Sequence, residues 1–292
     1  MLSFNNDIAL KKQIVEHLKQ LPVDETIWKR STIAWDDSTG SGSFVGHIVQ
    51  SEKLDDWEKL GLPKWLALSL DYFFTASTDL KTAIELASSI FNAIPVGYDV
   101  QHVGSQYLIR LITHKELGIL KVTDAQILVN ALNKIIAIQQ QCLKNEDITA
   151  STWRSLRKEM IVNSQTFDDE SLEYLISTFA EAAAWNPVNS RTTVSDSVRI
   201  WGRIKSKAQP SLNWTQEREN HVRSLLNKLY NEAKAQQAEG SEEFIDVFKL
   251  LEKYEPEESA WLKAEIKWNR VQPTVFNAKA AELLADLFTQ VT

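Results

Sequence analysis

Four polar residues recur at helical spacing and are the best candidates for acid–base chemistry in this sequence. Asp99, His102, Gln106 and Arg110 follow the Pro95–Gly97 break, and a helix expected from about 99 to 114 would place them on one face. A carboxylate, an imidazole and a guanidinium on one face can transfer protons or bind an anion. The candidate catalytic residues are therefore Asp99, His102 and Arg110. The alternative is that Asp99 caps the helix and the stripe faces solvent or a neighbouring helix.

A second group of residues is suited to binding an anionic ligand. A turn over 185–191 leads into a helix on which Arg199, Arg203 and Lys207 recur every four residues. Such a surface could take a phosphate, a nucleic-acid strand or an acidic partner. The alternative is a solvated face that offsets acidic neighbours, for which the sequence offers Glu239, Glu242, Glu243, Asp246, Glu255, Glu257 and Glu258. The candidate binding residues here are Trp185, Arg191, Arg199, Arg203 and Lys207.

The segment 31–50 differs from the rest of the chain because it is rich in glycine and serine. Within it, residues 32–35 and 44–49 flank the stretch 36–43, and this pattern predicts either a small β-hairpin with a flexible tip or a long surface loop. Its glycines resemble a phosphate-binding loop only superficially, since no lysine stands in the required position. Trp35 beside two aspartates would suit a recognition loop, so Trp35 is a further candidate binding residue.

Other catalytic and metal-binding patterns are missing from the sequence. Cys142 is the single cysteine, so neither an intramolecular disulfide nor a cysteine-based zinc site can form. The five histidines are dispersed, and no serine stands in a nucleophile-elbow motif. We therefore expect neither a metal site nor a cofactor.

Helical periodicity runs through almost the whole chain and indicates the fold class. Apolar residues recur at three- and four-residue spacing, as in Ile127–Ile136 and Leu172–Ala183, and glycine (9) and proline (7) are scarce among 292 residues. We expect an all-α fold, an irregular helical bundle or short α-solenoid of about a dozen helices. It is expected to form one domain, 1–292, with 1–145 and 146–292 as two helical halves the alternative. Pro273 is expected to separate the last two helices.

Net charge and hydropathy argue against some classes of partner and against a membrane span. A net charge of -7 argues against broad binding to a phosphate backbone, so a nucleic-acid partner is not expected. No apolar run approaches the ~18 residues of a membrane span, and the first residues do not form a secretion signal. These features predict a cytoplasmic acidic protein.

The leading hypothesis is a non-enzymatic protein-interaction module, such as an inhibitor or immunity-type protein that neutralises another protein. The alternatives are an enzyme with a polar cleft around Asp99, His102 and Arg110, and nucleic-acid or phosphate binding through the basic helix 191–207.

Overall fold

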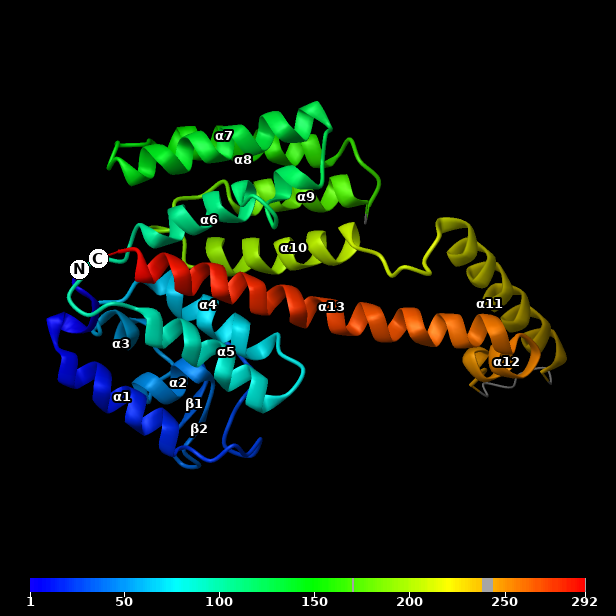
Figure 1. Ribbon diagram of the computed structural model, residues 1–292, viewed down its shortest axis with the longest axis horizontal. Helices are drawn as coiled ribbons and strands as arrows, with labels where there is room; N and C mark the ends of the chain where they lie inside the picture. The colour runs from blue at the N-terminus through cyan, green and yellow to red at the C-terminus, as the bar shows by residue number, and fades with distance from the viewer. Residues whose placement is uncertain (170, 238–243, 292) are drawn as a thin grey trace. The chain divides into compact units, whose positions relative to one another are not determined.

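The expected all-α fold is confirmed. The computed structural model describes residues 1–169, 171–237 and 244–291, and these contain thirteen α-helices and one two-stranded hairpin (Figure 1). The elements are η1 (Ser3–Asn6), α1 (Ile8–Gln20), β1 (Trp35–Asp36), β2 (Ser41–Gly42), α2 (Phe44–Val49), α3 (Leu54–Glu58), α4 (Lys64–Thr75), α5 (Leu80–Ala93), α6 (Val103–Thr113), η2 (Ile119–Lys121), α7 (Gln126–Leu143), α8 (Ala150–Ser164), α9 (Leu172–Ala182), α10 (Thr193–Ala208), α11 (Gln216–Gln236), α12 (Val247–Tyr254) and α13 (Pro256–Thr289). Within the described residues, no helix is both long enough and apolar enough to span a membrane.

The chain packs as two compact units. The first comprises Met1–Ala208 with Pro273–Thr292, and the second comprises Gln209–Gln272. Compact packing units do not test whether the chain folds as one domain or as the halves 1–145 and 146–292, so that expectation stays a prediction.

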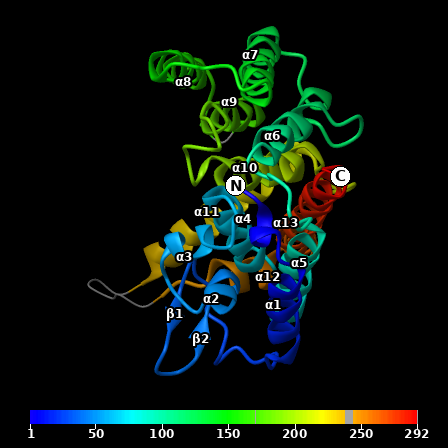
Figure 2. The ribbon, with the colours of Figure 1, turned by 90° about the vertical axis from the view of Figure 1, so that its left-hand side faces the viewer.

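The last part of α13 closes the core of the first unit. The hydroxyl of Tyr72 on α4 donates to Asn277 Oδ1 at 2.9 Å, and the hydroxyl of Tyr107 on α6 donates to the carbonyl of Ala280 at 2.6 Å. Figures 1 and 2 show this part of α13 beside α4, α6 and α10. Residues more than 170 positions apart therefore share one apolar core.

Helices α8, α9 and α10 form the part of the first unit that carries the candidate site. In both views α9 lies between α8 and α10 (Figures 1 and 2). The side chain of Thr149 caps α8 by accepting from the amide of Thr152, and Ser171 caps α9 by accepting from the amide of Tyr174. Burial of the apolar stripe of α9, which includes Phe179, holds the three helices together.

The hairpin near residues 31–50 is present but shorter than the sequence pattern indicates. Its strands pair only Trp35 with Gly42 and Asp36 with Ser41. The expected second strand, 44–49, is wrong: these residues form α2. The side chain of Ser43 accepts from the amide of Gly46 at 3.0 Å, which caps the helix start. On α4, Asp71 accepts from the amide of Val45 at 2.9 Å, so a tertiary contact together with the local cap overrides the strand preference of this segment.

The expected break at Pro273 is also wrong. Helix α13 runs from Pro256 to Thr289 with Pro273 inside it. Proline removes one amide donor and crowds the preceding turn, but the helix continues through it.

The second unit has a small apolar core of its own. Trp261 lies at its centre with Val222, Leu229 and Leu251, and its indole donates to the carbonyl of Asn213 at 3.0 Å. Such a small core contributes far less to stability than the extensive core of the first unit.

Candidate functional site

One cleft of the first unit gathers four of the six predicted binding residues. It has a volume of about 1120 Å³ and is formed by α8, α9, α10 and the connection 183–192, with Lys64 of α4. Trp185, Arg191, Arg199 and Arg203 all line it. We call it the basic cleft, because the described residues that line it include six cationic side chains and two carboxylates: Lys64, Arg154, Arg157, Arg191, Arg199 and Arg203 against Glu181 and Asp196.

Three of these cations already have carboxylate partners. Arg157 donates to Glu181 at 2.8 Å, and Arg199 is paired with Asp196 one turn earlier on α10. Lys64 is paired at 3.0 Å with two carboxylates of α3, and these contacts raise the pKa of its ammonium group. Their charge is largely neutralised within the protein.

The other three cations have no carboxylate partner among the described residues. Arg154 uses its Nε to donate to the carbonyl of Ala150 at 3.2 Å, and it has no ion pair with any described residue. Arg191 and Arg203 are exposed and have neither a hydrogen bond nor an ion pair within the described part of the chain. The cleft therefore presents three guanidinium groups whose charge is uncompensated.

The start of α10 adds to the positive potential of the cleft. Residues Ser190–Thr193 line it, and α10 begins at Thr193. The first amides of a helix lack intrahelical partners and carry a partial positive charge. Arg191 lies next to this helix start, so helix and side chain both favour an anion.

Trp185 is fixed in the cleft wall from two sides. Its ring lies under the guanidinium of Arg157, at 5.3 Å from ring centroid to guanidinium carbon. Its backbone carbonyl accepts from the side-chain amide of Gln139 at 2.9 Å, and the same amide donates to the carbonyl of Ala183. Gln139 on α7 is fully buried, so it anchors the connection that follows α9.

The structure places the other two predicted binding residues outside the cleft. Lys207 is exposed in the last turn of α10 and does not line the cavity. Trp35 belongs to the hairpin, where its indole donates to Asp37 at 2.6 Å and its ring packs edge-on against His47 at 5.3 Å. Both views show the hairpin away from α8, α9 and α10 (Figures 1 and 2).

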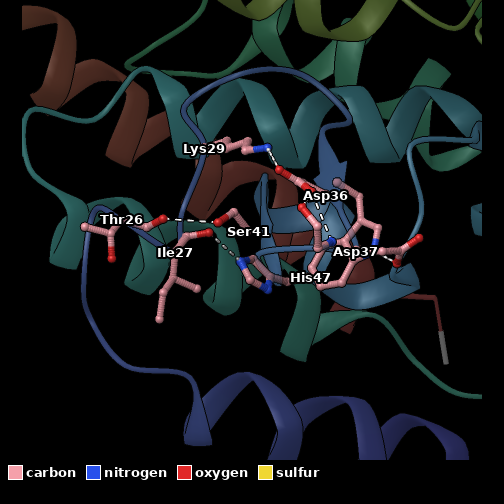
Figure 3. A network of polar contacts seen from close by, with 9 residues as sticks. Thr26, Ile27, Lys29, Asp36, Asp37, Ser41 and His47 are labelled. Carbon is pink, nitrogen blue, oxygen red and sulfur yellow. Dashed lines mark hydrogen bonds and ion pairs between the residues drawn. The ribbon is translucent and has the colours of Figure 1, made fainter.

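The polar groups around the hairpin bind one another (Figure 3). Lys29 pairs with Asp36 at 3.3 Å, and the Ser41 hydroxyl donates to the carbonyl of Thr26 at 3.1 Å. A hydrogen bond from Ser38 is the main cause that holds the pKa of Asp36 well below its usual range. These internal contacts assign the hairpin carboxylate at position 36 a structural role.

The predicted catalytic stripe lies along a second, smaller cavity. Asp99, His102, Gln106 and Arg110 all line a groove of about 620 Å³ beside α6. However, α6 begins at Val103, so the expectation that the helix starts at Asp99 is wrong. Asp99 instead accepts from the amide of Gln101 at 3.0 Å and lies 3.3 Å from the Met1 amino group.

The predicted acidic neighbours of the basic helix have other surroundings. Glu239, Glu242 and Glu243 lie outside the described residues. Asp246 caps α12, and Glu258 pairs with Arg218 at 3.0 Å, both within the second unit. In the described ranges, no group of three or more His, Cys, Asp and Glu side chains is placed to hold a metal ion.

The sequence pattern misses half of the basic cleft. Arg154 and Arg157 come from α8 and Lys64 from α4, and none of them belongs to the basic run of residues 191–207. The only local signal is the three-residue spacing of Arg154 and Arg157, which places both on one face of α8.

Comparison with known proteins finds no match among protein-family models, curated proteins or solved structures.

Proposed function

We propose that this protein is a non-enzymatic interaction module whose basic cleft binds an extended acidic segment of another protein. The observation that carries the proposal is the set of three unpaired guanidinium groups, those of Arg154, Arg191 and Arg203, in one cleft of an acidic chain. Uncompensated cations grouped in a cavity attract carboxylates and align them through charge-assisted hydrogen bonds.

The spacing of the arginines on α10 suits an extended chain. A helix rises about 1.5 Å per residue, so Arg199 and Arg203 are about 6 Å apart along its axis. In an extended strand, side chains on one face recur about every 6.6 Å. Acidic residues at alternate positions of a bound segment would therefore meet the unpaired Arg203 and, one step along, Arg199, for which the ligand carboxylate competes with Asp196.

Three features favour an acidic peptide over a single-stranded nucleic acid. One face of Trp185 is covered by Arg157, so at most its other face can stack a base. Glu181 and Asp196 line the cleft, and they repel a strand with a phosphate at every residue more than a peptide with carboxylates only at alternate positions. The net charge of -7 opposes the approach of a polyanion from a distance.

The lining also offers contacts for an apolar anchor. Trp185 is half-buried, and Val188 is 42% exposed at the cleft rim. Tryptophan and arginine are enriched among residues that dominate binding energy at protein interfaces. A partner segment that combines alternating acidic residues with one bulky apolar residue fits this lining best.

The test is fluorescence anisotropy with synthetic peptides that carry a dye. One peptide alternates glutamate and serine around a central leucine, a second has the same composition with the glutamates in one block, and a third replaces glutamate with lysine. We expect the alternating peptide to bind most tightly, with an affinity that falls as salt is added. A single-stranded oligonucleotide of similar length serves as the competing polyanion.

Matched variants locate the binding surface. Arg191→Ala/Arg203→Ala should weaken binding of the alternating peptide by about tenfold or more, since hydrogen bonds to charged groups contribute about 1.5–3 kcal/mol each. Lys12→Ala/Lys121→Ala removes the same charge from two exposed lysines outside the cleft and should change little. Tighter binding of the oligonucleotide, or equal losses in both double variants, would contradict the proposal.

A further inference from the structure

The groove beside α6 is a second cavity of the first unit, and its walls come from three separate helices. Its floor follows α6 from the turn at Asp99 to Thr113. One wall is the end of α7 and the other is the end of α13 with the residues after it. Its polar lining includes Asp99, Gln106, Arg110, Gln140 and Gln290, and its apolar lining includes Val103, Leu143 and Leu287.

Arg110 is a cation without a partner in this groove. It is half-buried, and no carboxylate lies within ion-pair distance of it in the part of the chain that the structure describes. Its Nε is buried and has no hydrogen-bond partner among the described residues. A guanidinium group in this position can donate two parallel hydrogen bonds to the two oxygens of one carboxylate.

The described residues that line the groove carry few charges. Among them Asp99 is the only carboxylate and Arg110 the only guanidinium or ammonium, and His102 adds an imidazole. Asp99 is held by the amide of Gln101 and the amino group of Met1, at the end of the groove away from Arg110. A phosphate carries a charge of about -1.5 to -2 at neutral pH, so a carboxylate fits this balance better.

Three carboxamides line the groove together with Asp99 and Arg110. Gln106, Gln140 and Gln290 are exposed, and none of their side chains makes a hydrogen bond with another described residue. Each carboxamide offers donors and an acceptor, which is the same combination that a peptide group requires. Half-buried Leu143 and Val291 add apolar surface beside them.

We infer that the α6 groove binds an extended ligand whose single carboxylate pairs with Arg110 and whose amide groups meet the glutamine carboxamides. The eleven residues of α6 span about 15 Å, which accommodates about four residues of an extended chain. The carboxy-terminal end of a peptide and a small N-acylated amino acid share this chemistry. The inference is independent of the basic cleft, because the two cavities have no lining residue in common.

The test is calorimetric titration of the full chain with three probes. These are an N-acetylated tetrapeptide of glycine and valine with a free carboxylate, the same peptide with a carboxy-terminal amide, and N-acetylvaline. The free acid should bind at least about tenfold more tightly than the amide. The amide is uncharged and cannot accept two charge-assisted hydrogen bonds from the guanidinium of Arg110. Comparable affinity of N-acetylvaline would identify a small ligand, and binding of the tetrapeptide alone would identify a peptide end.

Variants assign the binding to this groove. Arg110→Gln should abolish the difference between acid and amide, and Arg110→Lys should recover part of it because the charge stays but the fork is lost. Arg270→Gln is the matched control, because Arg270 is exposed on α13 and lines neither cavity, and it should leave both affinities unchanged. The comparison of acid with amide on the wild-type chain requires no variant, so a folding defect cannot hide the result. Equal affinities for acid and amide, undiminished binding in Arg110→Gln, or no binding by any probe would overturn the inference.

Discussion

The guanidinium of Arg157 covers the ring of Trp185 at 5.3 Å and at the same time donates to Glu181 at 2.8 Å. One side chain of α8 thus connects to α9 and to the connection that leads into α10. The arrangement holds the aromatic residue of the cleft wall in place before any ligand arrives, and such preorganisation lowers the entropic cost of binding.

Replacing this arginine tests the value of that arrangement. Arg157→Lys keeps the charge but loses the planar group that stacks on Trp185, an interaction contributing about 0.5–2 kcal/mol. We expect several-fold weaker binding of the alternating acidic peptide, measured by anisotropy. Arg223→Lys is the control, since Arg223 pairs with Glu219 on the surface of α11. Unchanged affinity in Arg157→Lys would show that the stack does not contribute to binding.

Gln139 and its neighbour Gln140 provide a test of positioning. Gln139→Leu removes the donor to the carbonyls of Ala183 and Trp185, so the free energy of unfolding should fall by about 1–3 kcal/mol. Peptide binding in the basic cleft should weaken as well, because Trp185 loses its anchor. Gln140→Leu changes an exposed side chain without a described partner and should alter stability by no more than about 0.5 kcal/mol. Denaturant unfolding and anisotropy on both variants separate the effects, and equal losses would contradict this role of Gln139.

Asp71 should make stability depend on pH. Its buried carboxylate accepts from the amides of Ile33 and Val45 and from the Ser43 hydroxyl, but desolvation dominates and raises its pKa to about 6. The unfolded carboxyl titrates near 3.8, so between these values the folded state binds more protons. Its stabilising contribution is therefore complete below the unfolded pKa and is lost as pH rises through about 6.

The measurement compares wild type with Asp71→Asn, which does not titrate. The wild-type free energy of unfolding, relative to the variant, should fall by about 3 kcal/mol between acidic and neutral pH, since one pKa unit corresponds to about 1.4 kcal/mol. Global charge effects act on both proteins and cancel in the difference. A constant difference across this range would show that the pKa of Asp71 is the same in the folded and unfolded states.

Gly61 and Gly40 both have a left-handed backbone conformation, but only Gly61 is packed closely against another segment of the chain. Gly61 has φ of 73°, and a Cβ there would lie 1.9 Å from the carbonyl oxygen of Leu2. Gly40 has φ of 62° in the hairpin tip, with no atom within 4 Å of the same position. Gly40→Ala should cost only about 1 kcal/mol of conformational strain, and Gly61→Ala should cost clearly more. Thermal unfolding of both variants checks this order, and equal shifts would indicate that the segment at Leu2 moves freely.

Local signals in the sequence predict the all-α class and most helix positions. Apolar spacing on α7 and α9 identifies buried faces because each face depends only on residues three or four positions apart. The same local reasoning places Arg199 and Arg203 on one face of α10. It fails at residues 44–49, where β-branched side chains favour a strand but Ser43 and the distant Asp71 bind the amides of a helix start.

The tertiary structure alone decided how these residues are combined. It brought Arg154 and Arg157 of α8 to the arginines of α10 through the shared neighbour α9, and it placed Trp35 on a separate part of the first unit. It also paired Lys64 with carboxylates of α3, leaving Arg154, Arg191 and Arg203 as the uncompensated cations. Helix periodicity is encoded within a few residues of chain, whereas a cavity depends on which buried faces pack together. That choice is made by contacts between segments far apart in the sequence, and a residue's own neighbours along the chain do not reveal it.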